Sequence, residues 1–371
     1  MSAAMRIARI DVFGLQVAYR FGSFSLSGER TAASEPSTLV RVTTDDGIEG
    51  WGESCPLTGA YLPAFGGGVR AALAELAPAL IGADPRNLAE VTALMDATLL
   101  GQEAAKSALD VACWDVLGQA VSLPVATLLG GRVSERLPLY EAIPLGTPDE
   151  TAQRLQESWD RGFRRFQLKV GTDPRADVVA VRRVLELTGE EGLVIVDANG
   201  GWRLDDALVA VRLLEPLPVY LEQPCRTFAE CLHVRRTTGL PMIYDEVVTD
   251  SASLMRAVQE GGASVVNLKV SKVGGLTRAK QLRDLAHSLG ARVMIEDSWG
   301  GDVATAAIAH LAASTQPSSL FAVSFVNDAT DGLIAGHNPR SEAGHSAAPT
   351  APGLGIAVDP APLGQPLFSF S

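Results

Sequence analysis

The stretch RFQLKVG, residues 165–171, alternates polar and apolar side chains with a period of two. Phe166 and Leu168 would share one face of a β-strand, with Gln167 and Lys169 on the other. A polar face on so apolar a strand has two explanations: a solvated sheet edge or a reaction centre. The surrounding sequence decides between them, because similar strands follow along the chain.

Short apolar segments recur from about residue 135 onward, and amphipathic segments typical of helices separate them. The apolar segments are FRRFQLKV, GLVIVDANG, PVYLEQP, PMIYDE, SVVNLKVS and ARVMIEDS. Strand alternating with helix indicates βαβ units, and a repeat of roughly two dozen residues is the size of one (β/α)8-barrel unit. A doubly wound open sheet is the alternative. It would normally carry a Gly-rich nucleotide turn, and KVGTDPRAD is not one, so we expect a barrel.

The first hundred residues have a pattern typical of an α+β domain. Residues 5–17 and 37–53 predict strands, with Asp46-Gly47 at a hairpin turn. The polar segment 18–36 between them is long enough for a mobile flap. We expect three regions: an N-terminal capping domain at 1–126, the barrel at 127–340, and a C-terminal tail at 341–371 that packs on the cap.

Composition limits the classes of function. A formal net charge of −12 over 371 residues argues against binding of nucleic acid or an anionic membrane, because both need a basic surface. The four cysteines show no CxxC spacing, which favours reduced thiols. No apolar stretch reaches the length of a membrane span, and the start resembles a strand more than a signal peptide. We therefore expect a cytoplasmic protein.

Charged residues lie at or near the ends of six successive predicted strands. They are Lys169, Asp197, Glu222, Asp245, Lys269 and Asp297. A single acid there is commonly a helix N-cap, and a single lysine commonly extends to solvent. In a parallel barrel, however, all carboxyl ends of strands lie on one rim, where active sites are built. The six charges should therefore converge.

Three of these acids, Asp197, Glu222 and Asp245, follow consecutive strands and would repel one another unless a cation lay between them. Carboxylate oxygens suit Mg²⁺, and the absence of His at these strand ends argues against zinc. Lys169 and Lys269 flank the acids and should lie across the barrel from each other.

This arrangement suits removal of a proton from the carbon next to a carboxylate. A divalent cation stabilises the enediolate that forms, as in enolase-superfamily sites. A lysine is a usable base only if its pKa falls towards about 7–8, which burial and Mg²⁺ promote. Two lysines on opposite faces of the carbon would allow racemisation, epimerisation or elimination.

The chain resembles the enolase superfamily, muconate-lactonizing-enzyme-like subgroup, over essentially its full length. The motifs that carry the resemblance are LKVG, VDANGGW, LEQP, DE and NLKVSKVGG, with the helix ALDVACWD and the LLGG after it. The resemblance implies a modified TIM barrel, (β/α)7β, under an α+β cap built from the N-terminal region and the C-terminal tail, with one Mg²⁺ per subunit. By position, it implies Asp197, Glu222 and Asp245 as metal ligands and Lys169 and Lys269 as paired acid/base groups.

Four further residues match positions around that centre. The resemblance implies that Asn199, Glu246 and Gln167 support the metal ligands without binding the ion themselves. Gln167 is a departure, because many members have K-x-K on this strand where this chain has Q-x-K. Lys272 is expected in a surface ion pair or in one that supports the ligands.

The segments LEQPC, SWGGD and PGLGI are most similar to members that act on proline derivatives, namely hydroxyproline-betaine 2-epimerases and cis-3-hydroxy-L-proline dehydratases. By this resemblance, Asp297 would pair with a substrate ammonium, and Tyr61 and Trp299 would line the pocket. These relatives carry a Trp on the last strand where this chain has Ser324. A quaternary ammonium would lack that aromatic face, which favours a free or differently substituted amino acid.

The leading hypothesis is a Mg²⁺-dependent racemase, epimerase or dehydratase that acts on a small amino-acid carboxylate, proline-like in shape. A muconate-type cycloisomerase or another single-base syn-elimination enzyme is the alternative within the subgroup. A metal-stabilised barrel that binds a ligand without chemistry is the alternative outside it. The resemblance also implies a homo-oligomer, and we expect neither a nucleic-acid nor a membrane partner.

Overall fold

Eight parallel strands form the barrel sheet of the computed structural model, which describes residues 5–26, 30–331 and 333–371. They are β7 (Glu141–Ile143), β8 (Arg165–Lys169), β9 (Leu193–Asp197), β10 (Val219–Glu222), β11 (Met242–Tyr244), β12 (Ala263–Lys269), β13 (Arg292–Glu296) and β14 (Leu320–Val323). Spatial order follows chain order from β7 to β14, and each neighbouring pair is parallel. A bridge between Leu139, just before β7, and Val323 of β14 closes the barrel.

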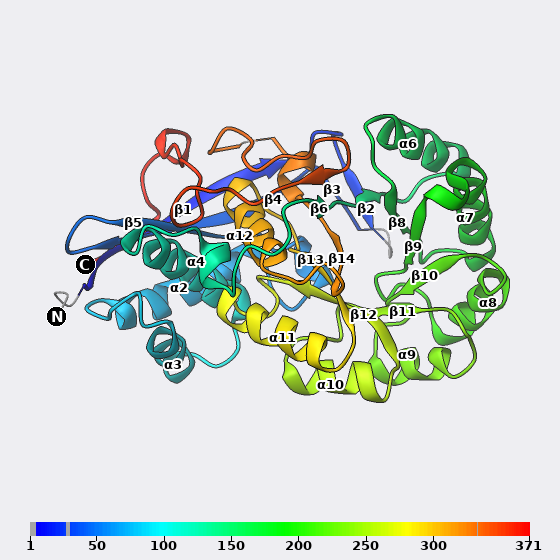
Figure 1. Ribbon diagram of the computed structural model, residues 1–371, viewed down its shortest axis with the longest axis horizontal. Coiled ribbons are helices and arrows are strands. Elements are labelled where there is room, and N and C mark those ends of the chain that lie inside the picture. The colour runs from blue at the N-terminus through cyan, green and yellow to red at the C-terminus, as the bar shows by residue number, and fades with distance from the viewer. Residues whose placement is uncertain (1–4, 27–29, 332) are drawn as a thin grey trace.

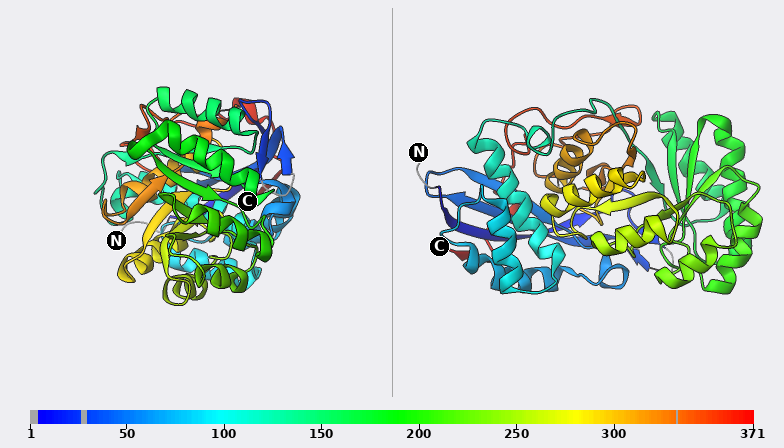
Figure 2. Two further views of the ribbon diagram at one scale, coloured as in Figure 1. Left: turned by 90° about the vertical axis from the view of Figure 1, so that its right-hand side faces the viewer. Right: turned by 60° about the horizontal axis from the view of Figure 1, so that its bottom comes forward.

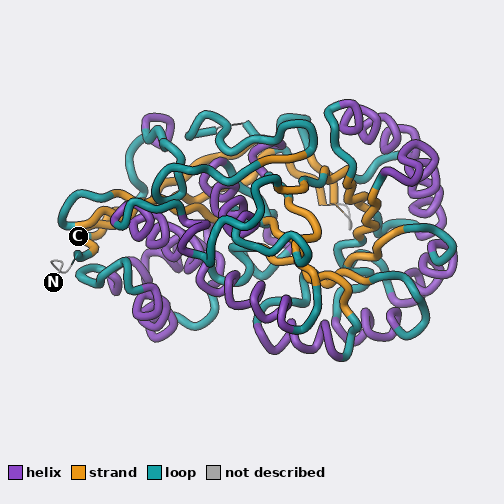
Figure 3. Tube along the Cα trace, in the orientation of Figure 1, coloured by secondary structure: helices purple, strands orange, loops and turns teal. Residues whose placement is uncertain are grey.

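A helix follows each of the first seven strands, so the (β/α)7β architecture expected from the sequence is confirmed. The helices are α6 (Pro148–Asp160), α7 (Pro174–Thr188), α8 (Leu204–Leu214), α9 (Phe228–Arg235), α10 (Ser251–Gln259), α11 (Leu276–Ser288) and α12 (Asp302–Ala313). Their apolar faces pack on the strands, and the helices surround the strands in Figure 3. Helices α6 to α9 form the end of the molecule opposite the two chain termini (Figures 1 and 2).

Large side chains fill the inside of the barrel. Ile195, Ile243, Val265, Met294 and Phe321 belong to one buried cluster there. Because side chains alternate along a strand, the residues two positions further on, such as Asp197 after Ile195, point to the same interior. The barrel is therefore closed by apolar packing, and its polar inward residues lie at the carboxyl ends of the strands.

A second, antiparallel sheet forms the cap with the order β16-β1-β4-β5. Its strands are β1 (Ile7–Ala18), β4 (Ser34–Thr44), β5 (Glu49–Ser54) and β16 (Phe368–Phe370), and its main helices are α2 (Gly66–Leu80), α3 (Leu88–Thr98) and α4 (Glu103–Ala120). The predicted turn at Asp46-Gly47 joins β4 to β5, with Gly47 at a φ of 88°. Strand β16 of the C-terminal tail pairs with β1, which places both termini at the cap end in Figure 1.

Short elements complete the chain. They are α1 (Thr58–Tyr61), α5 (Val125–Leu128), β2 (Phe24–Leu26), β3 (Arg30–Ala32), β6 (Leu137–Pro138), β15 (His345–Ser346), and the 3-10 helices η1 (Gly189–Glu191), η2 (Val326–Ala329) and η3 (Ala361–Leu363). In the segment expected to be a flap, β2 and β3 pair as antiparallel strands, and residues 27–29 lie outside the described residues.

Helix α4 of the cap, which contains the ALDVACWD motif, carries two buried acids that bind backbone groups of other segments. The carboxylate of Asp110 accepts a hydrogen bond of 3.0 Å from the backbone N–H of Thr277, at the start of α11. Asp115 accepts from the backbone N–H of Trp51 at 2.9 Å and of Leu354 at 2.8 Å. Strand β5 lies so close to α4 that a Cβ at Gly52 would be 1.8 Å from the carbonyl oxygen of Ala108. Asp110 therefore joins the cap to the barrel, and Asp115 joins the C-terminal tail to the cap.

Two expectations about the whole chain can be compared with the structure. All four cysteines are buried free thiols. Over the described ranges, no helix is both long enough and apolar enough to span a bilayer. The exact domain limits, 1–126, 127–340 and 341–371, stay a prediction.

Candidate active site

Inward-facing residues at the carboxyl ends of the strands bring the predicted charges together. Lys169, Asp197 and Glu222 end three adjacent strands, β8 to β10, and are paired in register. Lys269 ends β12 in register with Glu296, which ends β13. In the ring of eight strands β8 and β12 are four places apart, so the two lysines project from opposite sides of the barrel.

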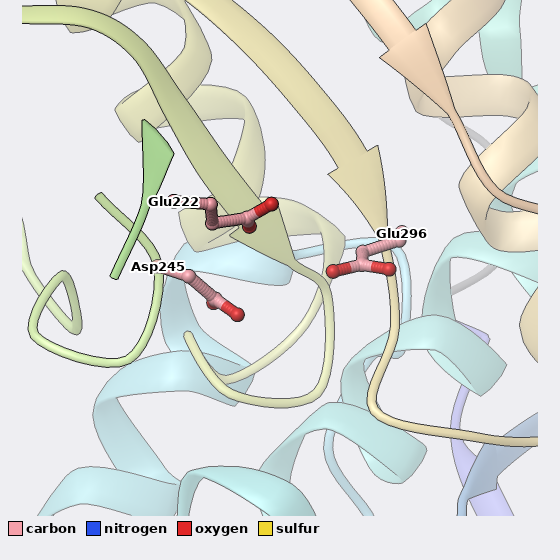
Figure 4. Close-up of side chains that lie close together, drawn as sticks. All are labelled: Glu222, Asp245 and Glu296. Carbon is pink, nitrogen blue, oxygen red and sulfur yellow. The ribbon is translucent and has the colours of Figure 1, made fainter. Parts of the chain in front are cut away.

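Three carboxylates form a tight acidic cluster between the lysines. Glu222, Asp245 and Glu296 each offer an oxygen, and these oxygens all lie within 4.8 Å of one another. Figure 4 shows the three side chains extending into one space from neighbouring parts of the barrel. The Nζ atom of Lys269 lies 3.0 Å from a Glu296 oxygen and also bonds to the Asp245 carboxylate.

Asp197, predicted as a metal ligand, lies beside this cluster. One of its oxygens is 2.6 Å from the Nζ atom of Lys169, and the other accepts from the backbone N–H of Asn199 at 2.8 Å. The Asn199 side chain donates in turn to Glu246 at 3.0 Å. The predicted supporting residues therefore lie next to the predicted ligands.

Amide side chains hold the cluster from within the barrel. Gln167 donates to Glu222 at 2.8 Å. Asn267 donates to both Glu222 and Glu296, at 2.8 Å and 2.6 Å, and the hydroxyl of Tyr140 also donates to Glu296. Glu222 and Glu296 are thus held in fixed orientations by neutral side chains.

The sequence reasoning missed Glu296, Asn267 and Tyr140. For two of them a signal existed, because Glu296 follows Met294, and Asn267 precedes Lys269, at the spacing of two that selects one face of a strand. The predicted residue, Asp297, lies one position after Glu296 and so does not follow this alternation. Nothing comparable pointed to Tyr140, which precedes the short strand β7.

Asp297 has a different environment from the acidic cluster. Its carboxylate accepts from the backbone N–H groups of Ser271 at 3.0 Å and Ser298 at 2.7 Å, and from the Ser271 hydroxyl. Burial raises the pKa of Asp297 to about 6, although these hydrogen bonds oppose the rise. Asp297 also lines the central cavity, so its predicted role towards a substrate ammonium is compatible with its position.

Lys272 is buried and binds Asp245. Its Nζ atom donates to the side chain of Asp245 at 2.7 Å and to its backbone carbonyl at 2.6 Å. Of the two possibilities expected for Lys272, the surface ion pair is wrong and the supporting ion pair is present. The GG pair after Lys272 turns the chain into α11 and keeps this lysine inside.

Both catalytic candidates line one small cavity of about 50 Å³, beneath the cap. Tyr61 and Trp299, predicted to line the pocket, do so, with Leu57, Ala142, Ser324 and Val326. The Tyr61 hydroxyl accepts from Lys269 at 2.6 Å and donates to Asp245 at 3.1 Å. The cap therefore contributes a side chain that contacts the reactive groups of the barrel.

The charged groups of the site determine the pKa values of its two lysines. Burial disfavours a charged lysine, but Asp197 and Glu222 outweigh this and hold the pKa of Lys169 above its ordinary value. The pKa of Lys269 is raised for the same reason, by Asp245 and Glu296. The acids thus oppose the fall in lysine pKa expected from burial, and a divalent cation among them would offset their charge.

The pKa values of the acids depend on the same charged groups. Burial, then repulsion by Asp197 and Asp245, raises the pKa of Glu222 well above its ordinary value. For Asp245, burial acts upward but Lys269 and Lys272 outweigh it, so its pKa is lowered. The carboxylates of this cluster repel one another when ionised, and no His or Cys is among the donors. Such a cluster fits a hard divalent cation.

A closed parallel barrel, with an acidic cluster between two opposed lysines under an α+β cap, defines an enolase-type barrel enzyme. Residues 150–362 match the family described as enolase C-terminal domain-like, and residues 10–130 match the mandelate racemase/muconate lactonizing enzyme N-terminal domain. The chain belongs to this group of the enolase superfamily, as its sequence motifs implied.

Individual relatives agree with this assignment. The chain is 41% identical to the cis-3-hydroxy-L-proline dehydratase of Roseibium aggregatum, over 99% of this chain and 100% of that protein. It is 30% identical to the N-succinyl-L-Arg/Lys racemase of Bacillus cereus, over 84% and 85% of the two chains. A solved enolase-superfamily structure from Roseovarius nubinhibens ISM, complexed with magnesium, superposes with a TM-score of 0.93 at 36% identity, over 99% and 100%. The relatives are lyases and isomerases, and this chain is an enzyme of the same superfamily.

Proposed function

We propose that this enzyme removes the proton alpha to the carboxylate of a small, proline-like amino acid, with racemisation, epimerisation or dehydration as the outcome. The observation that carries the proposal is the pair of buried lysines on β8 and β12, which face one cavity from opposite sides. The similarity to a cis-3-hydroxy-L-proline dehydratase supports the substrate class.

Asp197, Glu222 and Asp245 would hold one Mg²⁺, with Asn199, Glu246, Gln167 and Asn267 orienting them. The donor set is made of carboxylates alone, which suits this ion. When bound, the ion supplies the positive charge that stabilises an enediolate. Glu296 remains next to Lys269 and neutralises part of its charge.

Each lysine acts at its own face of the substrate carbon. Neutral Lys169 or Lys269 accepts the alpha proton, and the protonated partner across the cavity donates a proton to the opposite face. Delivery to the same carbon inverts it. In cis-3-hydroxy-L-proline the alpha hydrogen and the 3-hydroxyl lie on opposite faces of the ring. Donation to that hydroxyl, followed by loss of water, therefore completes an anti elimination with the same two groups.

The cavity favours a small substrate with a single carboxylate. Its volume of about 50 Å³ corresponds to about three to five water molecules, close to the size of a proline ring. Among the described residues that line it, Lys169 and Lys269 are the only cations, so no group would neutralise a second carboxylate. This disfavours muconate and N-succinyl amino acids. Asp297 would pair with the substrate ammonium, and Tyr61 and Trp299 would contact its ring.

Exchange of the alpha hydrogen in deuterium oxide tests the proposal. With Mg²⁺ and proline or its 3-hydroxylated forms, the enzyme should exchange or eliminate the alpha hydrogen. Lys169→Ala and Lys269→Ala should each lower the reaction at their own face by about 10²- to 10⁴-fold. Lys280→Ala, on the partly exposed part of α11, is the matched control. Normal exchange in both active-site variants would refute the two-base assignment, and loss of exchange in only one of the two variants would favour a single-base enzyme.

Two further parts of the proposal concern the protein in the cell. We propose a homo-oligomer, as the family resemblance implies, and a cytoplasmic location, as expected from the sequence. Light scattering after size-exclusion chromatography tests the oligomeric state.

A further inference from the structure

A carboxylate of the cap binds the start of a barrel helix. Glu53 lies on β5 and is buried, with an exposed fraction of 3%. Its carboxylate accepts from the backbone N–H of Gly301 at 2.8 Å and of Ala304 at 3.0 Å, and from the hydroxyl of Ser37 at 2.7 Å. The N-cap residue of α12, Gly301, has no side chain to bind these groups itself. Glu53 therefore caps α12 from the other domain.

Gly300 determines how the chain enters α12. A Cβ at Gly300 would lie 2.6 Å from the Cβ of Ala304, and Gly300 has a φ of 153°, which residues with a side chain rarely adopt. A Cβ at Gly301 would be at an ordinary contact distance, 3.5 Å from a Glu53 oxygen. Gly300 therefore permits the backbone course that presents the N–H groups of Gly301 and Ala304 to Glu53.

The bound loop forms one wall of the central cavity. Trp299, directly before the two glycines, is buried and lines the cavity with both lysines. Its ring lies 4.5 Å, centroid to centroid, from the ring of Tyr19, which directly follows strand β1. Glu53 and Tyr19 thus hold the loop from two parts of the cap: Glu53 binds its backbone, and Tyr19 contacts its indole ring.

We propose that Glu53 is a positioning residue that sets substrate affinity by holding Trp299 in the cavity wall. Glu53 does not line the cavity, so it acts through the loop. The inference deepens the proposed function, since it assigns a determinant of substrate binding in that same site. It is also independent of which amino acid binds, because its first readout needs no substrate.

The spectroscopic test measures how accessible Trp299 is to acrylamide. Each protein is compared with its Trp299→Phe counterpart, which isolates the Trp299 signal from those of the other four tryptophans. Glu53→Gln keeps the shape of the side chain but replaces one accepting oxygen with an NH₂ group, which cannot accept a hydrogen bond. We expect the quenching constant of Trp299 to rise at least about twofold, because the loop loses one of the two oxygens that accept its backbone hydrogen bonds. An unchanged constant would overturn the proposal.

The kinetic test separates positioning from a loss of stability. Asp115→Asn is the matched control, since Asp115 is also a buried carboxylate that accepts from two backbone N–H groups but does not line the cavity. In Glu53→Gln we expect KM to rise about tenfold while kcat changes less than about twofold. Asp115→Asn should lower thermal stability and leave KM unchanged. Equal effects on KM in both variants would overturn the proposal.

Ser37→Ala provides a milder change if Glu53→Gln does not fold. It removes the Ser37 hydroxyl donor to Glu53 and should shift both readouts in the same direction by a smaller factor. If the wild-type enzyme exchanges no amino acid, the proposed function fails, but acrylamide quenching still decides whether Glu53 holds Trp299.

Discussion

The Nζ atom of Lys169 lies 2.6 Å from an Asp197 oxygen, and the two residues are direct partners on adjacent parallel strands. A predicted base and a predicted metal ligand are therefore in contact. Across the barrel, Lys269 makes the corresponding contact with Asp245. Because each lysine contacts a candidate ligand, a change in the charge of the acids changes the proton affinity of the bases.

The third metal ligand can be identified by comparing two acids. Glu222 and Asp245 belong both to the set implied by the family and to the tight cluster, which has Glu296 in place of Asp197. We expect Asp197→Asn to weaken Mg²⁺ binding more than about a hundredfold, and Glu296→Gln only about tenfold, because a lost ligand costs more than a lost neighbour. Calorimetric titration measures both. The reverse order would assign the ligand role to Glu296.

Asn267 should matter for the metal although it does not bind it. Asn267→Leu is similar in size and removes both hydrogen bonds to Glu222 and Glu296. We expect Mg²⁺ affinity to fall by about 10- to 100-fold. Gln156→Leu, on the exposed face of α6, should leave the affinity unchanged. An Asn267 variant with normal affinity would show that the carboxylates are oriented without it.

The hydroxyl of Tyr61 should act on one face of the reaction. It accepts a hydrogen bond from Lys269, so Tyr61→Phe should slow exchange at the Lys269 face by about tenfold and have less effect at the other. Tyr220→Phe is the control, since the Tyr220 hydroxyl accepts a hydrogen bond from Arg292 at a different place inside the barrel. Measuring deuterium uptake with each enantiomer separates the two faces. Equal slowing at both would contradict the assignment.

Asp115 should make stability depend on pH. Burial raises its pKa from 3.8 to about 6, against the opposing hydrogen bonds from Leu354 and Trp51. An acid with a raised pKa contributes stability that is present below pH 3.8 and lost as the pH rises through 6. Relative to Asp115→Asn, the wild type should therefore lose on the order of 3 kcal/mol between pH 4 and 7. Urea unfolding across that range measures the difference, and a constant difference would show that Asp115 does not titrate as described.

The sequence predicted the barrel and most of the site because both depend on local periodicity. Alternation along RFQLK puts Gln167 and Lys169 on one face, and the structure confirms that both point inward. The same rule, applied to VMIED, selects Glu296, which lies in the acidic cluster and was not among the predicted residues. Asp297, the predicted residue one position later, also lines the cavity, and its role towards a substrate ammonium stays a prediction.

The sequence by itself determined the order of strands and helices, the polar residues at the strand ends and the family. These features depend on patterns between residues that are near neighbours in the chain, and such patterns can be read directly from the sequence. Only the tertiary structure decided that Lys272 is buried against Asp245, that Tyr61 reaches Lys269, and that Glu53 caps α12. The physical reason is that these contacts join residues far apart in sequence, and they exist only after the barrel has closed and the cap has packed on its rim.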